Sequence, residues 1–330
     1  MSESADTDGP VVLFGEALFD DLPSGPRPGG APLNVARHLR AFGVDPLLVT
    51  RVGADEPGEW LVAAMRRWGL DTRGVQRDRD HPTGRVTVRV IGDRHRFEIP
   101  PLQAWDFIDG TITARALGAS TPDVLCFGTM AQRHPESRRA LRDLLSRRCS
   151  SHLLDVNLRA PWYDPQIIEA SLLAADVLKL NESELNTLAD LFRLPDGGAA
   201  RADALIRRFS IREVVITYGS EGAQLVEAGG GRMRACGTPL GPSLVDTVGA
   251  GDAFTAVLVL GARRGWPAPL TLTRAERFAR AICRIAGAIP DDSHFYDPYV
   301  AEWDLQGGHS DGREEPVHLH AERPRTHTWT

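Results

Sequence analysis

Residues 245–254, VDTVGAGDAF, place a Gly-Ala-Gly turn before an apolar run, with an aspartate on each side of the turn. Apolar residues continue at helical spacing, which predicts a helix that begins near Ala250 and ends at Gly261 or Gly265. The first turn of a helix has unpaired N–H groups and a positive dipole end, and glycines let a phosphate approach it. The stretch therefore predicts an anion site, in which Asp252 is either part of the chemistry or an ordinary first-turn acid.

Composition indicates an ordinary globular protein. The 330 residues are 42% hydrophobic and 25% charged, which is enough for one large domain, or one domain with a small appendage. The formal net charge of −6 gives no electrostatic reason to expect nucleic acid or an anionic membrane as a partner. Lys179 is the only lysine, and its surroundings, DVLKLNE, are not a P-loop.

The cysteines and the N-terminus bear on location. Four cysteines lie far apart without a C-x-x-C pair, which argues against a zinc site and favours reduced thiols in the cytosol. The first residues, MSESADTDGP, lack the basic and apolar regions of a signal peptide, and no apolar run reaches membrane-spanning length. We therefore expect a cytoplasmic protein without a membrane partner.

Short apolar runs alternate with amphipathic segments along the chain. The runs predict buried strands at 11–15, 47–53, 123–128, 152–157, 176–181 and 213–219. The segments between them have helical spacing, and the first two end at Gly43 and Gly69. This alternation predicts an α/β, doubly wound fold with a mostly parallel sheet and helices on both faces.

Two regions break the alternation. Residues 83–100 alternate apolar and polar positions across a Gly-Asp turn, which predicts a hairpin that is either a small β-sheet lid over a ligand or a surface decoration. Residues 305–330 are polar and without periodicity, which predicts a disordered tail after a single domain spanning 1–304.

The N-terminal part carries a first group of candidate residues. Asp20 precedes Gly29 and Gly30, and Asn34 follows at the start of a helix. Glycines allow close approach of a ligand, and a carboxylate with an amide can bind neighbouring hydroxyls. The alternative is a turn followed by a helix cap.

A second group follows the later strands. Asn181 and Glu184 form an N-x-x-E pattern that is typical of a capping box, and the same two side chains can hold waters of a magnesium ion. Thr217, Gly219 and Gly222 lie in a glycine-containing loop after the next strand, which alone is compatible with any β-turn.

Four motifs together resemble the PfkB, or ribokinase-like, carbohydrate kinase family. GGAPLNVARHLRAFG and DTVGAGDAFTAVLVLG are similar to the two signature regions, NESE to the N-x-x-E motif, and ITYGSEG to the nucleotide loop T-x-G-x-x-G. They occur in the family order and frame residues 15–288. GEALFD, DVNLR and GAIPDDSHFYD look most like bacterial fructokinases.

The resemblance implies a role for each motif position. Asp252 is implied as the general base that accepts the proton of a sugar hydroxyl, beside an anion hole of backbone amides. The implied anion hole consists of Gly249, Ala250 and Gly251; the sugar contacts are Asp20, Gly29, Gly30 and Asn34; the nucleotide contacts are Asn181, Thr217, Gly219 and Gly222; and Asn181 with Glu184 would organise Mg²⁺.

Further implications concern substrate and ions. The implied reaction is ATP-dependent phosphorylation of a sugar hydroxyl, with D-fructose at carbon 6 favoured and 2-keto-3-deoxygluconate or a nucleoside as alternatives. The GGAP sequence stands where ribokinases have a lysine-bearing GGKG, which argues against ribose. Asp246 is similar to a position that some relatives use for K⁺. Arg159, with Asn157 in DVNLR, is a candidate substrate contact or a surface arginine.

Two other protein classes compete with a kinase. A dinucleotide-binding oxidoreductase is disfavoured because Phe254 stands at the last position of G-x-G-x-x-G. A catalytically silent sugar-binding regulator is disfavoured by the presence of Asp252 with an intact Gly-Ala-Gly. Pairing of lid sheets between subunits would give a homodimer, which one sequence leaves open.

Overall fold

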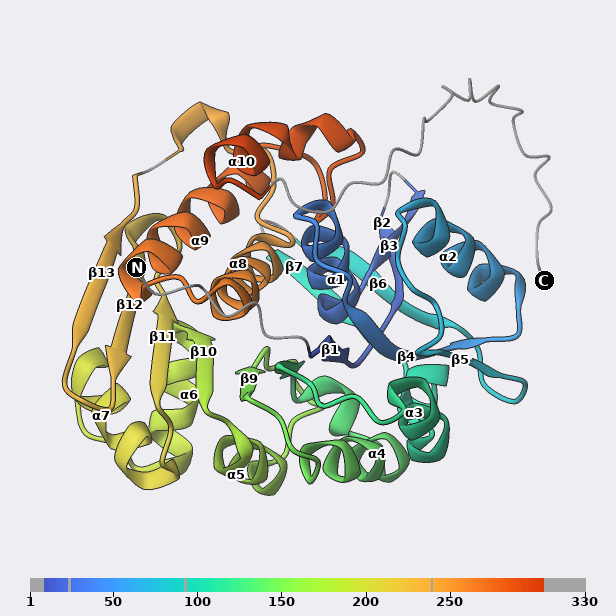
Figure 1. The fold of residues 1–330 in the computed structure, drawn as a ribbon, viewed down its shortest axis with the longest axis horizontal. Coiled ribbons are helices and arrows are strands. Elements are labelled where there is room, and N and C mark those ends of the chain that lie inside the picture. The colour runs from blue at the N-terminus through green and yellow to red at the C-terminus, as the bar shows by residue number, and fades with distance from the viewer. Residues whose placement is uncertain (1–8, 23–24, 92–93, 239, 306–330) are drawn as a thin grey trace.

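The structure, a computed structural model, describes residues 9–22, 25–91, 94–238 and 240–305. Within these ranges the largest element is a nine-stranded sheet (Figure 1). Its strands, from one edge to the other, are β13 (Arg232–Cys236), β12 (Gly222–Glu227), β11 (Glu213–Thr217), β10 (Val177–Asn181), β9 (Ser151–Asp155), β8 (Val124–Phe127), β1 (Val11–Phe14), β4 (Leu47–Gly53) and β5 (Val75–Asp78).

The sheet is mostly parallel, as predicted. Neighbours from β11 to β5 pair in parallel, whereas β12 and β13 extend one edge in antiparallel pairing. The chain order runs outward from β1 through β4 on one side and through β8 on the other. Ligands bind outside the carboxyl ends of strands where the order reverses in this way.

Helices cover both faces of the sheet, as predicted (Figure 1). One face is covered by α1 (Ala31–Ala41), α2 (Glu56–Arg67), α8 (Ala250–Arg264) and α9 (Ala268–Ile282). The other is covered by α3 (Gly110–Leu117), α4 (Pro135–Leu145), α5 (Pro165–Ala174), α6 (Glu182–Phe192) and α7 (Gly198–Phe209). Short segments complete the described chain: η1 (Ala104–Phe107), η2 (Met130–Gln132), η3 (Gly219–Glu221), η4 (Gly241–Ser243), η5 (Ser293–Tyr296) and α10 (Asp297–Glu302).

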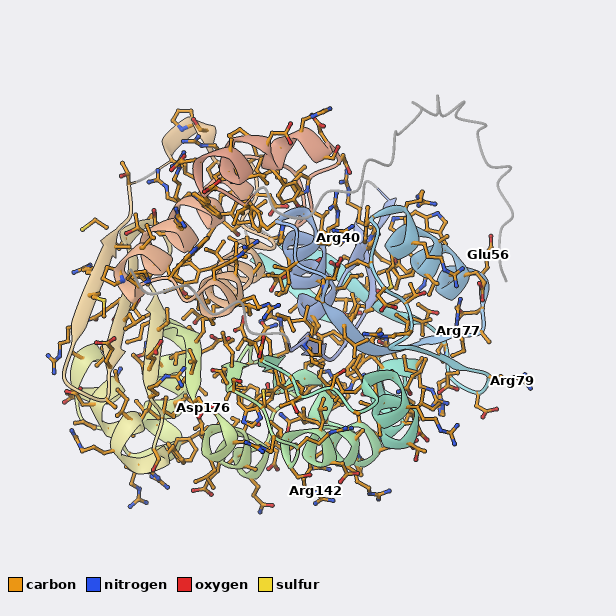
Figure 2. The ribbon with its side chains drawn as sticks, viewed as in Figure 1. Arg40, Glu56, Arg77, Arg79, Arg142 and Asp176 are labelled. Carbon is orange, nitrogen blue, oxygen red and sulfur yellow. The ribbon has the colours of Figure 1, made fainter. Side chains whose placement is uncertain are left out.

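Each face of the sheet has its own hydrophobic core. On the α1 side, Phe42, Phe278 and Tyr296 pack edge to face or tilted, with ring centroids 4.9–6.0 Å apart. On the outer surface, charged side chains such as Arg79 and Arg142 are exposed and point away from these cores (Figure 2). No helix within the described ranges is both long and apolar enough to cross a membrane.

A separate four-stranded sheet contains the predicted hairpin. In the described chain its order is β3 (Gly25–Gly29), β2 (Leu18–Leu22), β6 (Gly84–Ile91) and β7 (Arg94–Glu98), and β6 and β7 form the hairpin. The sequence did not predict β2 and β3. Pro26 and Pro28 hide the strand pattern, and they are tolerated because β3 is an edge strand.

The predicted helix limits at the chain's second signature are confirmed. Helix α8 begins at Ala250, and Gly265 ends it with a φ of 62°. Gly43 and Gly69 follow α1 and α2 with φ of 79° and 69°. Leu305 is buried, and residues 306–330 of the predicted tail lie outside the described residues.

Candidate active site

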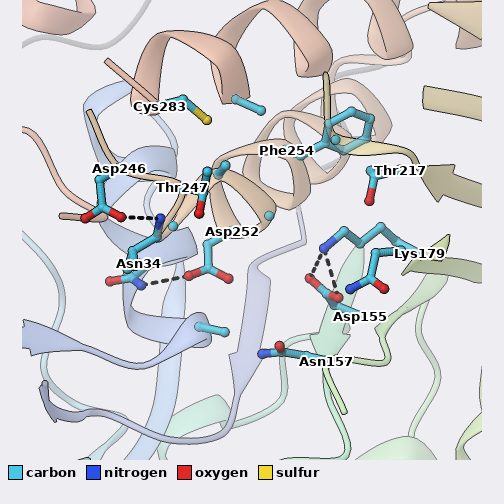
Figure 3. A pocket seen from close by; sticks show the side chains of 18 of the residues that line it. Asn34, Asp155, Asn157, Lys179, Thr217, Asp246, Thr247, Asp252, Phe254 and Cys283 are labelled. Carbon is cyan, nitrogen blue, oxygen red and sulfur yellow. Dashed lines mark hydrogen bonds and ion pairs between the residues drawn. The ribbon is translucent and has the colours of Figure 1, made fainter. Parts of the chain in front are cut away.

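A cavity of about 790 Å³ opens at the carboxyl ends of the central strands (Figure 3). The four-stranded sheet of β3, β2, β6 and β7, called the lid sheet below, contributes Leu18 and Val86 to the cavity wall. The N-terminus of α8 contributes the Gly-Ala-Gly turn. All the candidate residues line this cavity except Gly29. A Cβ on Gly29 would lie 2.2 Å from Asp20 Oδ2, so this glycine makes room for the Asp20 carboxylate that lines the cavity.

The Gly-Ala-Gly turn exposes the start of α8 to the cavity. Ala253 donates the first helix hydrogen bond to Gly249, at 2.8 Å, so the amides before Ala253 belong to the open helix end. The Ala250 amide donates a hydrogen bond to the carbonyl of Thr247 at 3.3 Å, inside the turn itself. Gly249 has a φ of 78°, and a Cβ there would lie 2.3 Å from the Cβ of Ala288. Only glycine fits this helix start.

Asp252 contacts the first signature region across the cavity. Asn34 on α1, 218 residues away, donates a hydrogen bond from Nδ2 to Asp252 Oδ2 at 2.7 Å (Figure 3). The pKa of Asp252 is raised overall. Removal from water is the largest cause and the charge of Asp155 adds to it, whereas the Asn34 hydrogen bond lowers the pKa. Asn34 Oδ1 is buried and has no hydrogen-bond partner among the described residues, so it can accept a hydrogen bond from a ligand hydroxyl.

Sequence reasoning missed a buried ion pair beside this turn. Lys179 on β10 donates to both carboxylate oxygens of Asp155 at the end of β9, at 3.1 and 2.9 Å (Figure 3). Thr255 on α8 donates to the same carboxylate at 2.7 Å. Burial alone would lower the pKa of Lys179, but Asp155 and Glu184 outweigh it, so the pKa is raised and the ammonium stays charged.

The position of Lys179 adds positive charge to the helix end. A Cβ on Gly251 would lie 3.2 Å from Lys179 Nζ, so the ammonium is in contact distance of the Gly-Ala-Gly turn. The available signal was a lone lysine two residues before Asn181, at the end of a predicted strand.

Asn181 and Glu184 form the predicted capping box at the start of α6. Asn181 Oδ1 accepts from the Glu184 amide at 2.9 Å, and Glu184 Oε2 accepts from the Asn181 amide at 2.8 Å. Glu184 Oε1 also accepts from the Leu158 amide at 3.0 Å, which fixes the carboxylate against the loop after β9. Burial and the Asp155 charge raise the pKa of Glu184.

Two further carboxylates lie at the lid side of the cavity. Burial and the charge of Asp252 raise the pKa of Glu16 to about 7, and the same causes raise the pKa of Asp20 to about 6. The charge of Arg159 lowers both pKa values. Glu16 is part of the GEALFD stretch, and the sequence predicted no role for it. Its burial beside Asp20 and Asp252 depends on tertiary structure, which the local sequence does not show.

The remaining candidates form the cavity's outer wall. Asp246 accepts hydrogen bonds from the Val248 amide at 3.0 Å and the Gly287 amide at 3.1 Å, so it joins the turn to the segment after α9. Thr217 ends β11, and a Cβ on Gly222 would lie 2.0 Å from the carbonyl of Ala235. The site thus combines an anion-binding helix end, a carboxylate beside it and polar groups for hydroxyls in one cavity.

A model of the pfkB family carbohydrate kinases matches residues 25–294, which is most of the chain. The chain belongs to this family. The match contains both signature regions and the capping-box and loop motifs between them. This agrees with the geometry, because phosphoryl transfer needs positioned charge more than covalent chemistry.

Curated relatives of this kinase include sugar kinases from archaea and bacteria. A putative sugar kinase of Pyrococcus horikoshii is 28% identical over 253 residues, covering 71% of this chain and 73% of the relative. A fructokinase of Klebsiella pneumoniae is 29% identical over 280 residues, covering 77% and 84%.

Solved structures share the fold. The P. horikoshii sugar kinase in complex with ATP has a TM-score of 0.69 at 25% identity, covering 84% of this chain and 93% of that one. A double mutant of the Vibrio cholerae fructokinase with fructose, ADP and potassium has a TM-score of 0.72 at 23% identity, covering 88% and 99%. The kinase described here therefore has the ribokinase-like fold.

Proposed function

We propose that this carbohydrate kinase transfers the γ-phosphoryl group of ATP to the 6-hydroxyl of D-fructose. The observation that carries the proposal is the 2.7 Å hydrogen bond between Asn34 and Asp252, because it joins the two signature regions at an anion-binding helix end. The relatives named fructokinase support fructose as the acceptor.

The proposed mechanism assigns one task to each side of the cavity. Asp20, Gly30, Asn34 and Arg159 bind the sugar hydroxyls, and Asp252 accepts the proton of the attacking hydroxyl. The raised pKa of Asp252 supports this role, since a base with a higher pKa binds the proton more strongly. The amides of Gly249, Ala250 and Gly251 then stabilise negative charge on the transferring phosphoryl group. Thr217, Gly219 and Gly222 contact the nucleotide.

The residues proposed for Mg²⁺ fit an ion held through water. Both oxygens of Glu184 accept backbone hydrogen bonds, so they remain fixed and retain lone pairs for water. Within the described ranges, no group of three or more His, Cys, Asp or Glu side chains is placed to hold a metal directly. Magnesium with few protein ligands, bound with the nucleotide, would neutralise phosphate charge. Asn181 and Glu184 orient its waters in this proposal.

Asp246 is the proposed K⁺ residue. Its carboxylate is held by two amides at the base of the turn, and a cation there would set the turn's geometry. We also assign residues 1–304 to one kinase domain, which contains the whole cavity.

A panel of acceptors tests the proposal. ATP consumption is measured with Mg²⁺, with and without K⁺, against D-fructose, other hexoses, ribose, 2-keto-3-deoxygluconate and adenosine. Turnover with the highest kcat/KM on D-fructose is expected. A higher kcat/KM on the keto acid or the nucleoside would replace fructose as the substrate, and no turnover on any acceptor would favour the silent regulator.

A further inference from the structure

One wall of the cavity has no role in the proposed chemistry. Helix α9 contributes Glu276, Ala279 and Arg280, and Cys283 follows directly after the helix; the four are spaced as one helical face. The same cavity is lined by Gly219 and Ser220 of η3 and by the apolar side chains of Leu240 and Leu244.

The position of this wall relates it to the nucleotide. If the proposed function holds, the γ-phosphoryl lies at the start of α8 and the sugar lies beside Asp20 and Asn34. The nucleotide must then extend away from the sugar, along η3, toward the α9 face. The apolar side chains of Ala279, Leu240 and Leu244 in this part of the cavity suit the faces of a purine, so the polar groups of the wall are left to contact its edge.

Glu276 is an unusual group in such a wall. Its side chain is only 12% exposed, and its Oε1 is buried without a hydrogen-bond partner among the described residues. Arg280 Nε lies 3.6 Å from Oε1, which is an ion pair beyond hydrogen-bond distance. Burial raises the pKa of Glu276 and the Arg280 charge lowers it. A buried acceptor without a donor is costly, and a donor from the ligand would remove that cost.

We propose that Glu276 binds the exocyclic 6-amino group of adenine and so selects ATP over nucleotides with a 6-oxo group. The amino group donates a hydrogen bond to the carboxylate, and the neighbouring Arg280 favours the charged form of that carboxylate. A 6-oxo purine presents an acceptor at the same place, and two facing acceptors repel. Sites built to bind a specific donor reject ligands that lack it.

Binding of ADP and IDP, measured by calorimetry without sugar, tests this inference. They differ at position 6 and at N1, which carries a hydrogen only in IDP, and a carboxylate placed at position 6 is expected to make the wild-type protein bind ADP at least ~10-fold more tightly. Glu276→Gln offers both an N–H and a carbonyl, so the two affinities should come within about 3-fold of each other. Glu169→Gln, on α5 outside the cavity, changes a carboxylate that also pairs with an arginine and should keep the wild-type ratio.

Each outcome is decisive. Equal affinities in the wild-type protein, or tighter binding of IDP through Arg280, overturn the inference without any variant. An unchanged ratio in a folded Glu276→Gln also overturns it. Absence of ADP binding contradicts the proposed ATP-dependent function as well, whereas selective ADP binding without turnover on D-fructose contradicts only the proposed acceptor.

Discussion

The two ends of the cavity hold their carboxylates differently. At the end proposed for the phosphoryl group, called the phosphoryl end below, Asp155 is paired with Lys179 and Thr255, and Glu184 accepts two backbone hydrogen bonds. At the end proposed for the acceptor, Glu16 is buried and Asp20 is half-buried, and both have raised pKa values. The phosphoryl end is therefore a fixed charge arrangement, and the acceptor end is one whose charge changes near neutral pH.

The largest expected effect on stability lies at the phosphoryl end. Lys179→Met leaves the Asp155 carboxylate buried without its cation, which should lower the free energy of unfolding by about 3–5 kcal/mol, measured by urea unfolding. Arg208→Met removes an exposed arginine from its pair with Glu169 and should cost less than about 1 kcal/mol.

A double variant separates the ion pair from packing. Lys179→Met combined with Asp155→Leu removes both charges and should recover part of the lost stability. If Lys179→Met alone is as stable as the wild-type protein, the ion pair of Lys179 and Asp155 does not stabilise the phosphoryl end, and the comparison between the two ends fails.

Glu16, at the acceptor end, should make the stability of the protein depend on pH. Its pKa is about 7 in the folded protein against an ordinary value of 4.5, so the folded state binds more protons between these values. Stability must therefore fall as pH rises through this window, by up to about 3 kcal/mol for this group. Glu16→Gln should be more stable than the wild-type protein at pH 8 and lose this advantage at pH 4, by urea unfolding. An advantage that is the same at both pH values would refute the raised pKa.

Asp20 should give the smallest effect, confined to sugar binding. Asp20→Asn replaces a hydroxyl acceptor by an amide, which should raise KM for the sugar by ~10-fold with a smaller change in kcat. Asp21→Asn is the matched control, because the neighbouring carboxylate pairs with Arg85 and does not line the cavity. Equal effects of both variants would show that Asp20 has no special contact.

What the sequence could predict depends on whether the signal is local in the chain. The start of α8 depends on local signals, glycines followed by helical apolar spacing, and the helix begins at Ala250, near which it was predicted to begin. The hairpin of β6 and β7 was also predicted, since its pattern alternates locally. The pair of Lys179 and Asp155 joins residues 24 positions apart, and Thr255 is 100 positions from Asp155. Such proximity depends on strand order, which local patterns do not encode.

Two misses have particular causes. The prolines of β3 obscured a strand that tolerates them only at a sheet edge. Glu276 looks like an ordinary surface residue of an amphipathic helix, and only the cavity shows that its side chain faces a ligand wall. The sequence motifs are enough to predict the type of reaction. The identity of the acceptor cannot be predicted in the same way, because it depends on tertiary contacts in the cavity.

The most direct test of the account is the kcat of Asp252→Asn with ATP and the best acceptor of the panel. An amide cannot take the hydroxyl proton, so kcat should fall by ~10²–10⁴-fold while the Kd for ADP stays within about 3-fold of the wild-type value. A kcat within about 10-fold of the wild-type value would contradict the assignment of Asp252 as the base, and with it the central claim.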